Sequence, residues 1–179
     1  MDALLVILGV IVALVVVLVA VAASKPDSFK LSRSTHIAAP AVDIFPLIND
    51  FHAWLQWSPW EKLDPNLQRT YTGAPHGVGA AYAWQGNRNV GHGEMAITES
   101  VPNSRIVIDL HFITPFEARN LTVFTIKETN GNQAEVEWAM SGKQPLMMRV
   151  MSIFMSLDKM IGKDFEAGLA AMKAAAEKR

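Results

Sequence analysis

Residues 119–141 read RNLTVFTIKETNGNQAEVEWAMS, and this stretch decides the fold. Asn130 and Gly131 at its centre form the strongest hairpin signal in the chain, because both residue types accept the positive φ of a tight turn. Apolar and polar residues alternate on both sides of this dipeptide, as they do in strands with one buried face. The stretch therefore predicts two antiparallel strands joined at Asn130-Gly131.

Similar strand patterns precede this hairpin and a helical pattern follows it. Short connections between the strands predict an antiparallel meander of about seven strands. Two short helices are expected at 40–50 and 50–57. From Pro145 to about Lys178 no strong breaker interrupts a stripe with helical spacing, which predicts one long helix. Strand patterns occur at 29–37, 67–72, 79–85, 87–91 directly followed by 92–100, 105–112, 119–128 and 133–141, and the stripe consists of Val150, Phe154, Leu157, Ile161, Phe165, Leu169 and Met172.

The beginning of the chain has a different composition. From Ala3 to Ala23 every residue is Ala, Leu, Val, Ile or Gly. As a helix this run spans about 31 Å, close to the ~30 Å of a bilayer core. We interpret 1–24 as a transmembrane helix, 25–28 as a linker and 29–179 as one domain. No basic residue precedes the run, and its length exceeds that of a signal core, which favours an anchor over a cleaved signal.

Basic residues after the apolar run bear on location. Lys25, Lys30 and Arg33 place the C-terminal domain in the cytoplasm under the positive-inside rule. The alternative is a cleaved signal, with Ala20-Val21-Ala22 as the small-x-small site, and an exported domain. Beyond the anchor, acidic and basic residues balance without a basic stripe, so the composition argues against a nucleic-acid partner.

Several motifs together resemble a known superfamily. These are HIAAPAVDIFPLINDFHAWLQWSPW (36–60), KLDPNLQRTYTG (62–73), the Asn130-Gly131 hairpin and LDKMIGKDFEAGLAAMK (157–173). Residues 29–178 resemble the SRPBCC (START/Bet v 1-like) superfamily and its polyketide cyclase/dehydrase branch. The resemblance implies an α+β helix-grip fold, in which an antiparallel sheet wraps around a long C-terminal helix. Members bind lipids, hormones or polyketides in the hollow between sheet and helix, and only some are enzymes.

Strand register predicts which side chains face this hollow. If Ser100 pairs with Arg105, Ile97 lies opposite Ile108, and Glu94 opposite His111 on the other face. A two-residue turn at Asn130-Gly131 pairs Val123 with Trp138 and Leu121 with Met140, all inward, and leaves Phe124 and Ile126 outside. The candidate ligand-binding residues are Tyr82, Trp84, Met95, Ile97, Ile108, Leu110, Phe112, Val123, Trp138, Met140, Met151 and Phe154.

Two aromatic and methionine-rich stretches have open roles. WLQWSPW (54–60) is interpreted first as a clasp that buries a helix junction and second as a wall of the hollow. PLMMRVMSIFM (145–155) is apolar on too many sides for one buried stripe. It either covers the mouth of the hollow, touches the bilayer beside the anchor, or is buried by the tryptophan turn.

The sequence names no catalytic residue and predicts no cofactor or metal. It lacks cysteine, a Gly-x-Ser-x-Gly elbow, a phosphate loop and a dinucleotide fingerprint. His92, Glu94 and His111 are interpreted as an outward surface cluster rather than a metal or acid–base site. The leading hypothesis is membrane-anchored binding or carriage of a small hydrophobic ligand. A cyclase-like enzyme and a non-catalytic membrane module with a solid interior are the alternatives.

Overall fold

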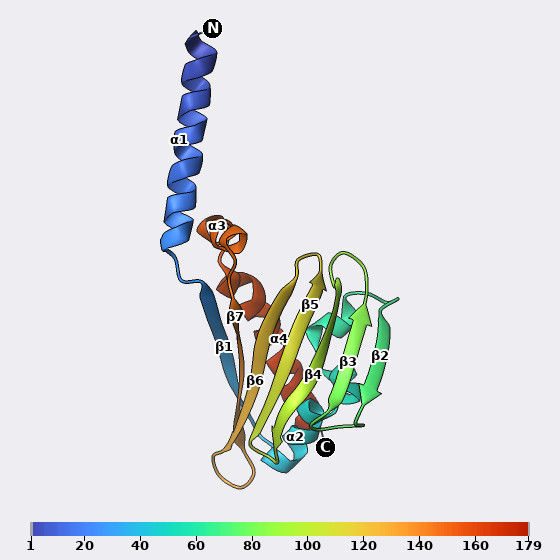
Figure 1. Ribbon diagram of the computed structural model, residues 1–179. Coiled ribbons are helices and arrows are strands. Elements are labelled where there is room, and N and C mark those ends of the chain that lie inside the picture. Colours follow the sequence, from blue (N-terminus) through green and yellow to red (C-terminus); the bar gives the residue numbers. More distant parts are fainter. Residues whose placement is uncertain (1, 179) are drawn as a thin grey trace.

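The computed structural model describes residues 2–178, without the side chains of Asp2 and Leu157. The Leu157 side chain of the predicted stripe therefore lies outside what the structure describes. The fold is α+β, as predicted, with one seven-stranded antiparallel sheet (Figure 1). The helices are α1 (Asp2–Ser24), α2 (Ala41–Asn49), η1 (Phe51–Gln56), η2 (Pro59–Lys62), α3 (Leu146–Phe154) and α4 (Leu157–Ala176). The strands are β1 (Ser28–Ile37), β2 (Gln68–Gly73), β3 (Ala80–Gln85), β4 (His92–Val101), β5 (Arg105–Thr114), β6 (Ala118–Glu128) and β7 (Ala134–Lys143).

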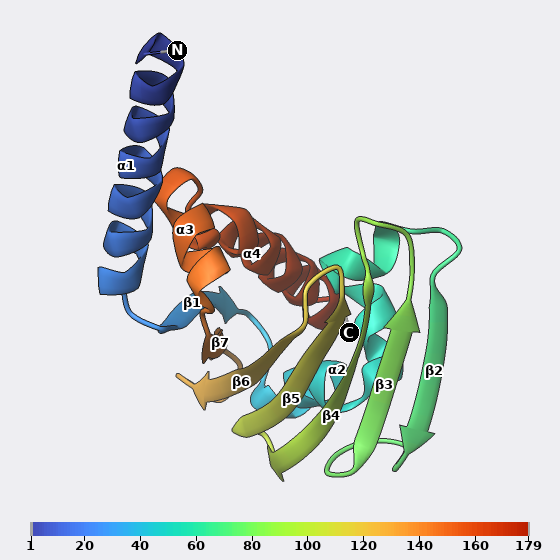
Figure 2. The ribbon, with the colours of Figure 1, turned by 45° about the horizontal axis from the view of Figure 1, so that its top comes forward.

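The strands lie in the order β1-β7-β6-β5-β4-β3-β2. β2 to β7 form the predicted meander, and β1 adds the last strand at one edge of the sheet by pairing with β7. The segment from α2 to η2 carries the chain from β1 at one edge to β2 at the other. The sheet curves around α4, which packs against β1 and β7 (Figure 2). Each layer thereby buries its one apolar face, and this arrangement confirms the helix-grip fold.

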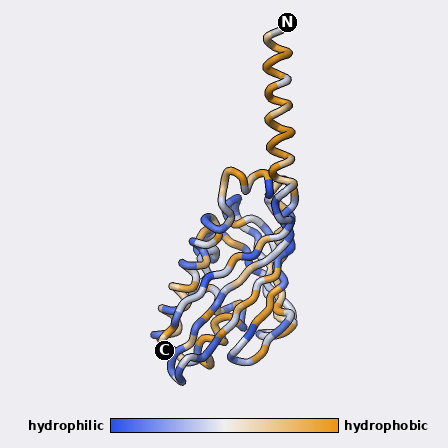
Figure 3. The backbone as a smooth tube through the Cα atoms, turned by 90° about the vertical axis from the view of Figure 1, so that its left-hand side faces the viewer, coloured by the Kyte–Doolittle hydropathy of each residue, from blue (hydrophilic) through white to orange (hydrophobic). Residues whose placement is uncertain are grey.

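α1 projects from the domain as a single straight helix (Figure 1). It is hydrophobic along its whole length (Figure 3). Residues Ala3–Ser24 contain an 18-residue window with a mean hydropathy of 3.6, and they are long and apolar enough to cross a membrane. A signal sequence near an N-terminus has the same properties, so length and composition alone leave both roles open.

The tryptophan stretch joins the short helices to the core. The Trp57 indole donates to the Leu47 carbonyl at 2.7 Å, and the Trp54 indole donates to the Ile48 carbonyl at 3.0 Å. Both carbonyls lie in the last turn of α2, where main-chain acceptors lack partners within the helix. Asp50 caps η1 by accepting from the main-chain N–H of His52. These contacts support the clasp interpretation of WLQWSPW.

The predicted single C-terminal helix is wrong, because the chain breaks between α3 and α4. Met155 is extended, with φ −133° and ψ 128°, and ends α3. Ser156 then caps α4, its hydroxyl accepting from the main-chain N–H of Lys159. Serine is a favoured N-cap residue, so this break is local chemistry that the apolar spacing concealed. The segment 87–91, expected as a strand, is part of a loop between β3 and β4.

The predicted inward positions of Val123 and Leu121 are also wrong. Phe124 lies opposite Trp138 in the sheet, whereas the prediction placed Val123 there. The connection is not a two-residue turn, since β6 ends at Glu128 and β7 begins at Ala134. A shift of one residue moves every side chain of a strand to the other face. Phe124 and Ile126 are accordingly buried, at 0% and 4% exposure.

The β4–β5 register agrees with the prediction for a reason that was not foreseen. Ile97 lies opposite Ile108, as expected, but Val101 rather than Ser100 pairs with Arg105. A bulge at Thr98 inserts one residue between these two points and restores the predicted pairing farther along.

Candidate ligand-binding cavity

A cavity of about 390 Å³ lies between the inner face of the sheet and α4. α4 covers β1 and β7, and it leaves the inner faces of β3 to β6 partly uncovered, where the cavity forms. From α4 the wall receives Ile161, Asp164 and Phe165. The interior is therefore hollow rather than solid. The volume falls within the ~300–1,000 Å³ range of small-molecule sites.

Eight of the predicted ligand-binding residues line this cavity, and four do not. Ile97 is buried in the core outside the lining, and Val123 lies on the outer face. Met151 and Phe154 are on α3 with 43% and 72% exposure, away from the cavity wall. The residues that line it are Tyr82, Trp84, Met95, Ile108, Leu110, Phe112, Trp138 and Met140.

Aromatic rings form the rigid part of the wall. Trp138 stacks on Phe165 of α4 with ring centroids 4.1 Å apart, and Trp60 meets Trp138 edge-on at 5.6 Å. At the other side the Trp84 ring packs against Gly93, whose missing side chain leaves the space that the ring occupies. Paired rings of this kind hold their positions more firmly than single aliphatic chains. The cavity has preformed walls.

Three polar groups in the wall have no hydrogen-bond partner among the described residues. They are the Asn120 side-chain oxygen, the Thr122 hydroxyl and the Trp138 indole N–H. All three residues are buried, at 7%, 3% and 2% exposure. Asn120 and Thr122 are adjacent on the inner face of β6, between β5 and β7. A buried unpaired polar group costs about 1–3 kcal/mol, so these positions are suited to a partner that enters from outside.

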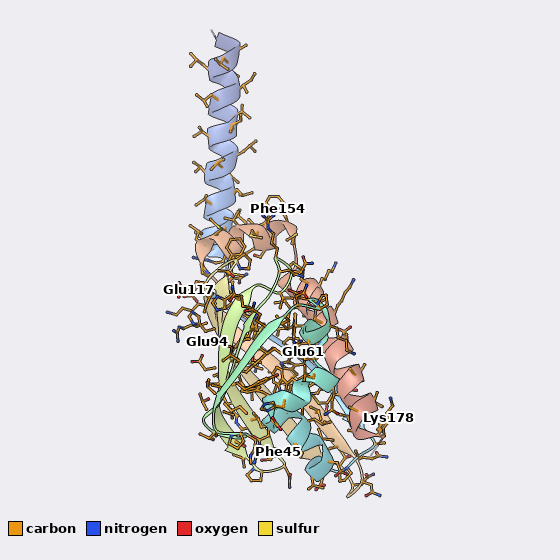
Figure 4. The ribbon with its side chains drawn as sticks, turned by 90° about the vertical axis from the view of Figure 1, so that its right-hand side faces the viewer. Phe45, Glu61, Glu94, Glu117, Phe154 and Lys178 are labelled. Carbon is orange, nitrogen blue, oxygen red and sulfur yellow. The ribbon has the colours of Figure 1, made fainter. Side chains whose placement is uncertain are left out.

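A buried ion pair forms the floor beneath Tyr82. The Glu61 carboxylate accepts from Arg69 Nε at 2.6 Å and from the Tyr82 hydroxyl at 2.7 Å. The Glu61 side chain is only 5% exposed and lies between sheet and helices in the middle of the domain (Figure 4). Burial, and then the bond to Glu61, raise the pKa of Tyr82 above its ordinary value. Tyr82 thus stays a neutral hydrogen-bond donor at physiological pH.

Asp164 contributes a second carboxyl group to the wall. Burial raises the pKa of Asp164 above its ordinary value. In the folded protein the neutral acid is therefore favoured relative to the unfolded chain.

The Asp164→Asn variant is expected to be more stable than the parent at neutral pH. Ionisation of Asp164 costs folding free energy because its folded pKa is raised, and this cost fades as the pH falls through the unfolded value near 4 and is absent well below it, where both states are protonated. The gain should therefore disappear as the pH falls. Asp158→Asn, in the same helix, is the opposite control, because the hydrogen bond from Arg33 lowers the pKa of Asp158. Thermal unfolding between pH 3 and 8 measures the stability of both variants. Equal pH profiles for the two variants would contradict the raised pKa of Asp164.

The histidine cluster lies on the outer face, as predicted. His111 Nδ1 is 3.2 Å from Glu94, and its Nε2 is 3.3 Å from Glu117. Both carboxylates point into solvent from the convex side of the sheet (Figure 4). An open depression bordered by Asp109 and Leu121 shares Phe29, Asn120 and Lys143 with the lining of the cavity.

Sequence reasoning missed the polar part of the site. Asn120 and Thr122 share the inner face of β6 with Phe124 and Ile126, whereas Leu121 and Val123 make the outer face look apolar. The neighbouring strand β7 carried a signal for the correct register, since Val136, Trp138 and Met140 alternate clearly and identify its inner face. No sequence signal identified Glu61 or Asp164 as site residues, because each lies in an ordinary helical turn.

A cavity enclosed by a curved antiparallel sheet and a C-terminal helix defines a helix-grip protein. Residues 28–177 match the model of the family described as polyketide cyclase / dehydrase and lipid transport. The chain belongs to this family, which confirms the resemblance drawn from the motifs. A comparison with curated proteins found no match.

Solved structures show the same fold. A solution NMR structure from Thermobifida fusca is similar with a TM-score of 0.64 and 23% identity, over 83% of this chain and 93% of that one. A crystal structure from Mesorhizobium loti has a TM-score of 0.59 and 14% identity, over 84% and 98%. The di-domain ARO/CYC protein BexL of the BE-7585A biosynthetic pathway has a TM-score of 0.61 and 15% identity, over 90% of this chain and 54% of that one.

Proposed function

We propose that this protein is a membrane-anchored binding protein that holds a small, mainly apolar molecule with one hydrogen-bonding group. The observation that carries the proposal is the hollow interior itself. Its wall is aromatic and aliphatic, yet it includes Asn120, Thr122 and Trp138, each of which has a buried polar atom without a hydrogen-bond partner among the described residues. Ligand sites in general combine apolar walls with a few orienting polar groups.

The expected energetics follow from this wall. Burial of apolar ligand surface contributes about 25 cal/mol per Å², before the costs of ordering the ligand. A hydroxyl group on the ligand could donate to the Asn120 side-chain oxygen or pair with the Thr122 hydroxyl, whereas a carbonyl group could only accept from Thr122. The ligand is thus an amphiphile with a short polar end, such as a lipid-derived or polyketide-like molecule.

The anchor is α1, in the division proposed above of a membrane helix at 1–24, a linker at 25–28 and a binding domain at 29–179. Lys25, Lys30 and Arg33 follow the apolar helix directly. Under the positive-inside rule they assign the binding domain to the cytoplasmic side. An exported domain after signal cleavage is the competing location.

Binding can be tested with 11-bromoundecanol, whose bromine quenches tryptophan and whose hydroxyl imitates a polar end. Trp54, Trp60, Trp84 and Trp138 line the cavity. Added to the full chain in lipid vesicles, the probe is expected to quench tryptophan saturably. 11-Bromoundecane, which lacks the hydroxyl, should bind more weakly. Quenching that rises linearly with probe concentration for both compounds would sink the proposal.

The Thr122→Val variant should separate stability from binding. Valine has nearly the same shape and removes an unpaired hydroxyl, so the empty protein should be as stable as the parent or more so. The affinity for 11-bromoundecanol should fall about tenfold, since the variant loses one hydrogen bond worth roughly 1.4 kcal/mol. Thr125→Val on the same strand, with its side chain on the outer face, is the control. If Thr122→Val binds 11-bromoundecanol as tightly as the parent, the Thr122 hydroxyl is not part of the binding site.

A cyclase-like enzyme is the second candidate. The specific observation in its favour is Asp164, a cavity-lining carboxyl whose raised pKa makes proton donation and acceptance easier near neutral pH. Turnover of a linear poly-β-ketone thioester that is lost in Asp164→Asn, with binding preserved, would support catalysis.

A further inference from the structure

α3 is fastened to the end of α1. Arg149 of α3 donates from Nη1 to the main-chain carbonyls of Ala23 at 3.3 Å and Lys25 at 3.2 Å. In return, Lys25 Nζ donates to the Ser152 carbonyl at 3.1 Å. Figures 1 and 2 both show α3 beside the base of α1. These bonds fix α3 at the level where the apolar run of α1 ends.

The surface of α3 is apolar and uncovered. None of its nine residues, all of which the structure describes, is buried. Phe154 is 72% exposed, Met147 67% and Met151 43%. Phe154 lies on α3 at the end of the domain from which α1 extends (Figure 4). This exposure contradicts the interpretation that the tryptophan turn buries α3.

The cavity mouth borders the same surface. Met148 of α3 and Phe116 of the β5–β6 loop both line the cavity, and Phe116 is 60% exposed. The β3–β4 loop supplies Val90, and Gly91 packs directly against the Thr114 carbonyl. Both loops lie at the end of the sheet that faces α1 (Figure 1). The mouth therefore opens toward the side from which the apolar helix emerges.

We infer that α3 and Phe116 form a membrane-docking surface that opens the cavity to the lipid leaflet. The inference rests on the proposed span of α1. The occupant of the surface is the bilayer itself, because the exposed side chains continue the apolar surface of α1 at its last turn. Helices in the boundary plane of a membrane bury one apolar face by about 5–10 Å. Flexible methionines suit a surface that meets disordered acyl chains.

This placement narrows the ligand class of the proposed function. A mouth seated in the leaflet admits molecules already dissolved in the bilayer, so their apolar part never crosses water. The ligand is then an amphiphile of the membrane rather than a water-soluble metabolite. Its polar end would meet Asn120 and Thr122 on β6.

Depth measurement on the full chain tests the docking surface. The chain contains no cysteine, so one introduced cysteine takes a bimane label at a single position. Labels at Phe154→Cys, Val12→Cys in α1 and Val42→Cys in α2 are compared in vesicles of phosphatidylcholine with doxyl groups on the acyl chains. Val42 is 57% exposed, and α2, which carries it, lies at the end of the domain opposite to α1 (Figure 1). The label at 154 should be quenched at least about half as strongly as that at 12, and the label at 42 should not be quenched.

Each outcome separates the two proposals. If the label at 12 is quenched and that at 154 behaves like that at 42, the docking inference is wrong while the anchor stands. If the label at 12 is not quenched, the span and the docking surface both fail, and saturable binding of 11-bromoundecanol still decides the ligand proposal. If unlabelled Phe154→Cys forms disulfide dimers whose yield falls on dilution, the surface contacts a second copy of the chain instead of the bilayer.

A rate measurement supplies a second readout. In vesicles that carry 11-bromoundecanol, the double variant Met151→Ser and Phe154→Ser should fill about tenfold more slowly, because less apolar surface holds the mouth in the leaflet. The final extent of tryptophan quenching should be unchanged, since neither residue lines the cavity. Val42→Ser is the matched exposed control. Equal rates for all three proteins would overturn the role of this surface in ligand entry.

Discussion

Trp57→Ala is expected to lower the free energy of unfolding by about 3–5 kcal/mol, the cost of removing a large aromatic side chain from a packed core. The side chain is 1% exposed and meets Phe124 and Trp138 edge-on. Its loss also leaves the Leu47 carbonyl at the end of α2 without the indole donor. Urea unfolding of the full chain in micelles, followed by near-UV circular dichroism, measures this. α1 contains no aromatic residue, so the signal reports on the domain.

Leu55→Ala is the matched control for this prediction. Leu55 lies in η1, two residues before Trp57, and is 48% exposed, so its truncation should change stability by no more than about 0.5 kcal/mol. Trp57→Phe should fall between the two, because it keeps a ring in the core and loses the hydrogen bond. If Trp57→Ala and Leu55→Ala cost the same, the clasp between η1 and α2 is not a source of stability.

The order of elements could be predicted from sequence because each pattern was strong locally. Period-two alternation identified most strands, and turn residues marked their ends. The pairing of β1 with β7 is not local, and the alternation did not predict it. The break after Phe154 was missed since apolar residues continue across it, whereas the capping hydroxyl of Ser156 decides the structure.

The candidate site was predictable only where its residues are apolar. Tyr82, Trp84, Met95 and Trp138 obey the rule that the inner face is hydrophobic, and all line the cavity. Asn120 and Thr122 break that rule on β6, and the assumed two-residue turn at Asn130-Gly131 turned the strand over, so neither residue was predicted to line the cavity. Functional positions are where local patterns are expected to fail, because a binding group is polar for the ligand rather than for the fold.

Glu61→Ala is expected to cost about 3 kcal/mol, near the lower end of the range for breaking a buried ion pair. The variant leaves Arg69 with one charged partner fewer and the Tyr82 hydroxyl without its acceptor. Arg69 is 25% exposed and still donates to the Leu67 carbonyl, so water and the main chain offset part of the loss. Glu99→Ala provides the comparison, because Glu99 forms the same kind of pair with Arg105 at 2.9 Å with both side chains near half exposure. That variant should lose no more than about 1 kcal/mol, the upper range for exposed pairs. Urea unfolding of the two variants side by side decides the matter: a similar cost at both positions would mean that the carboxylate under Tyr82 is solvated rather than part of the cavity floor.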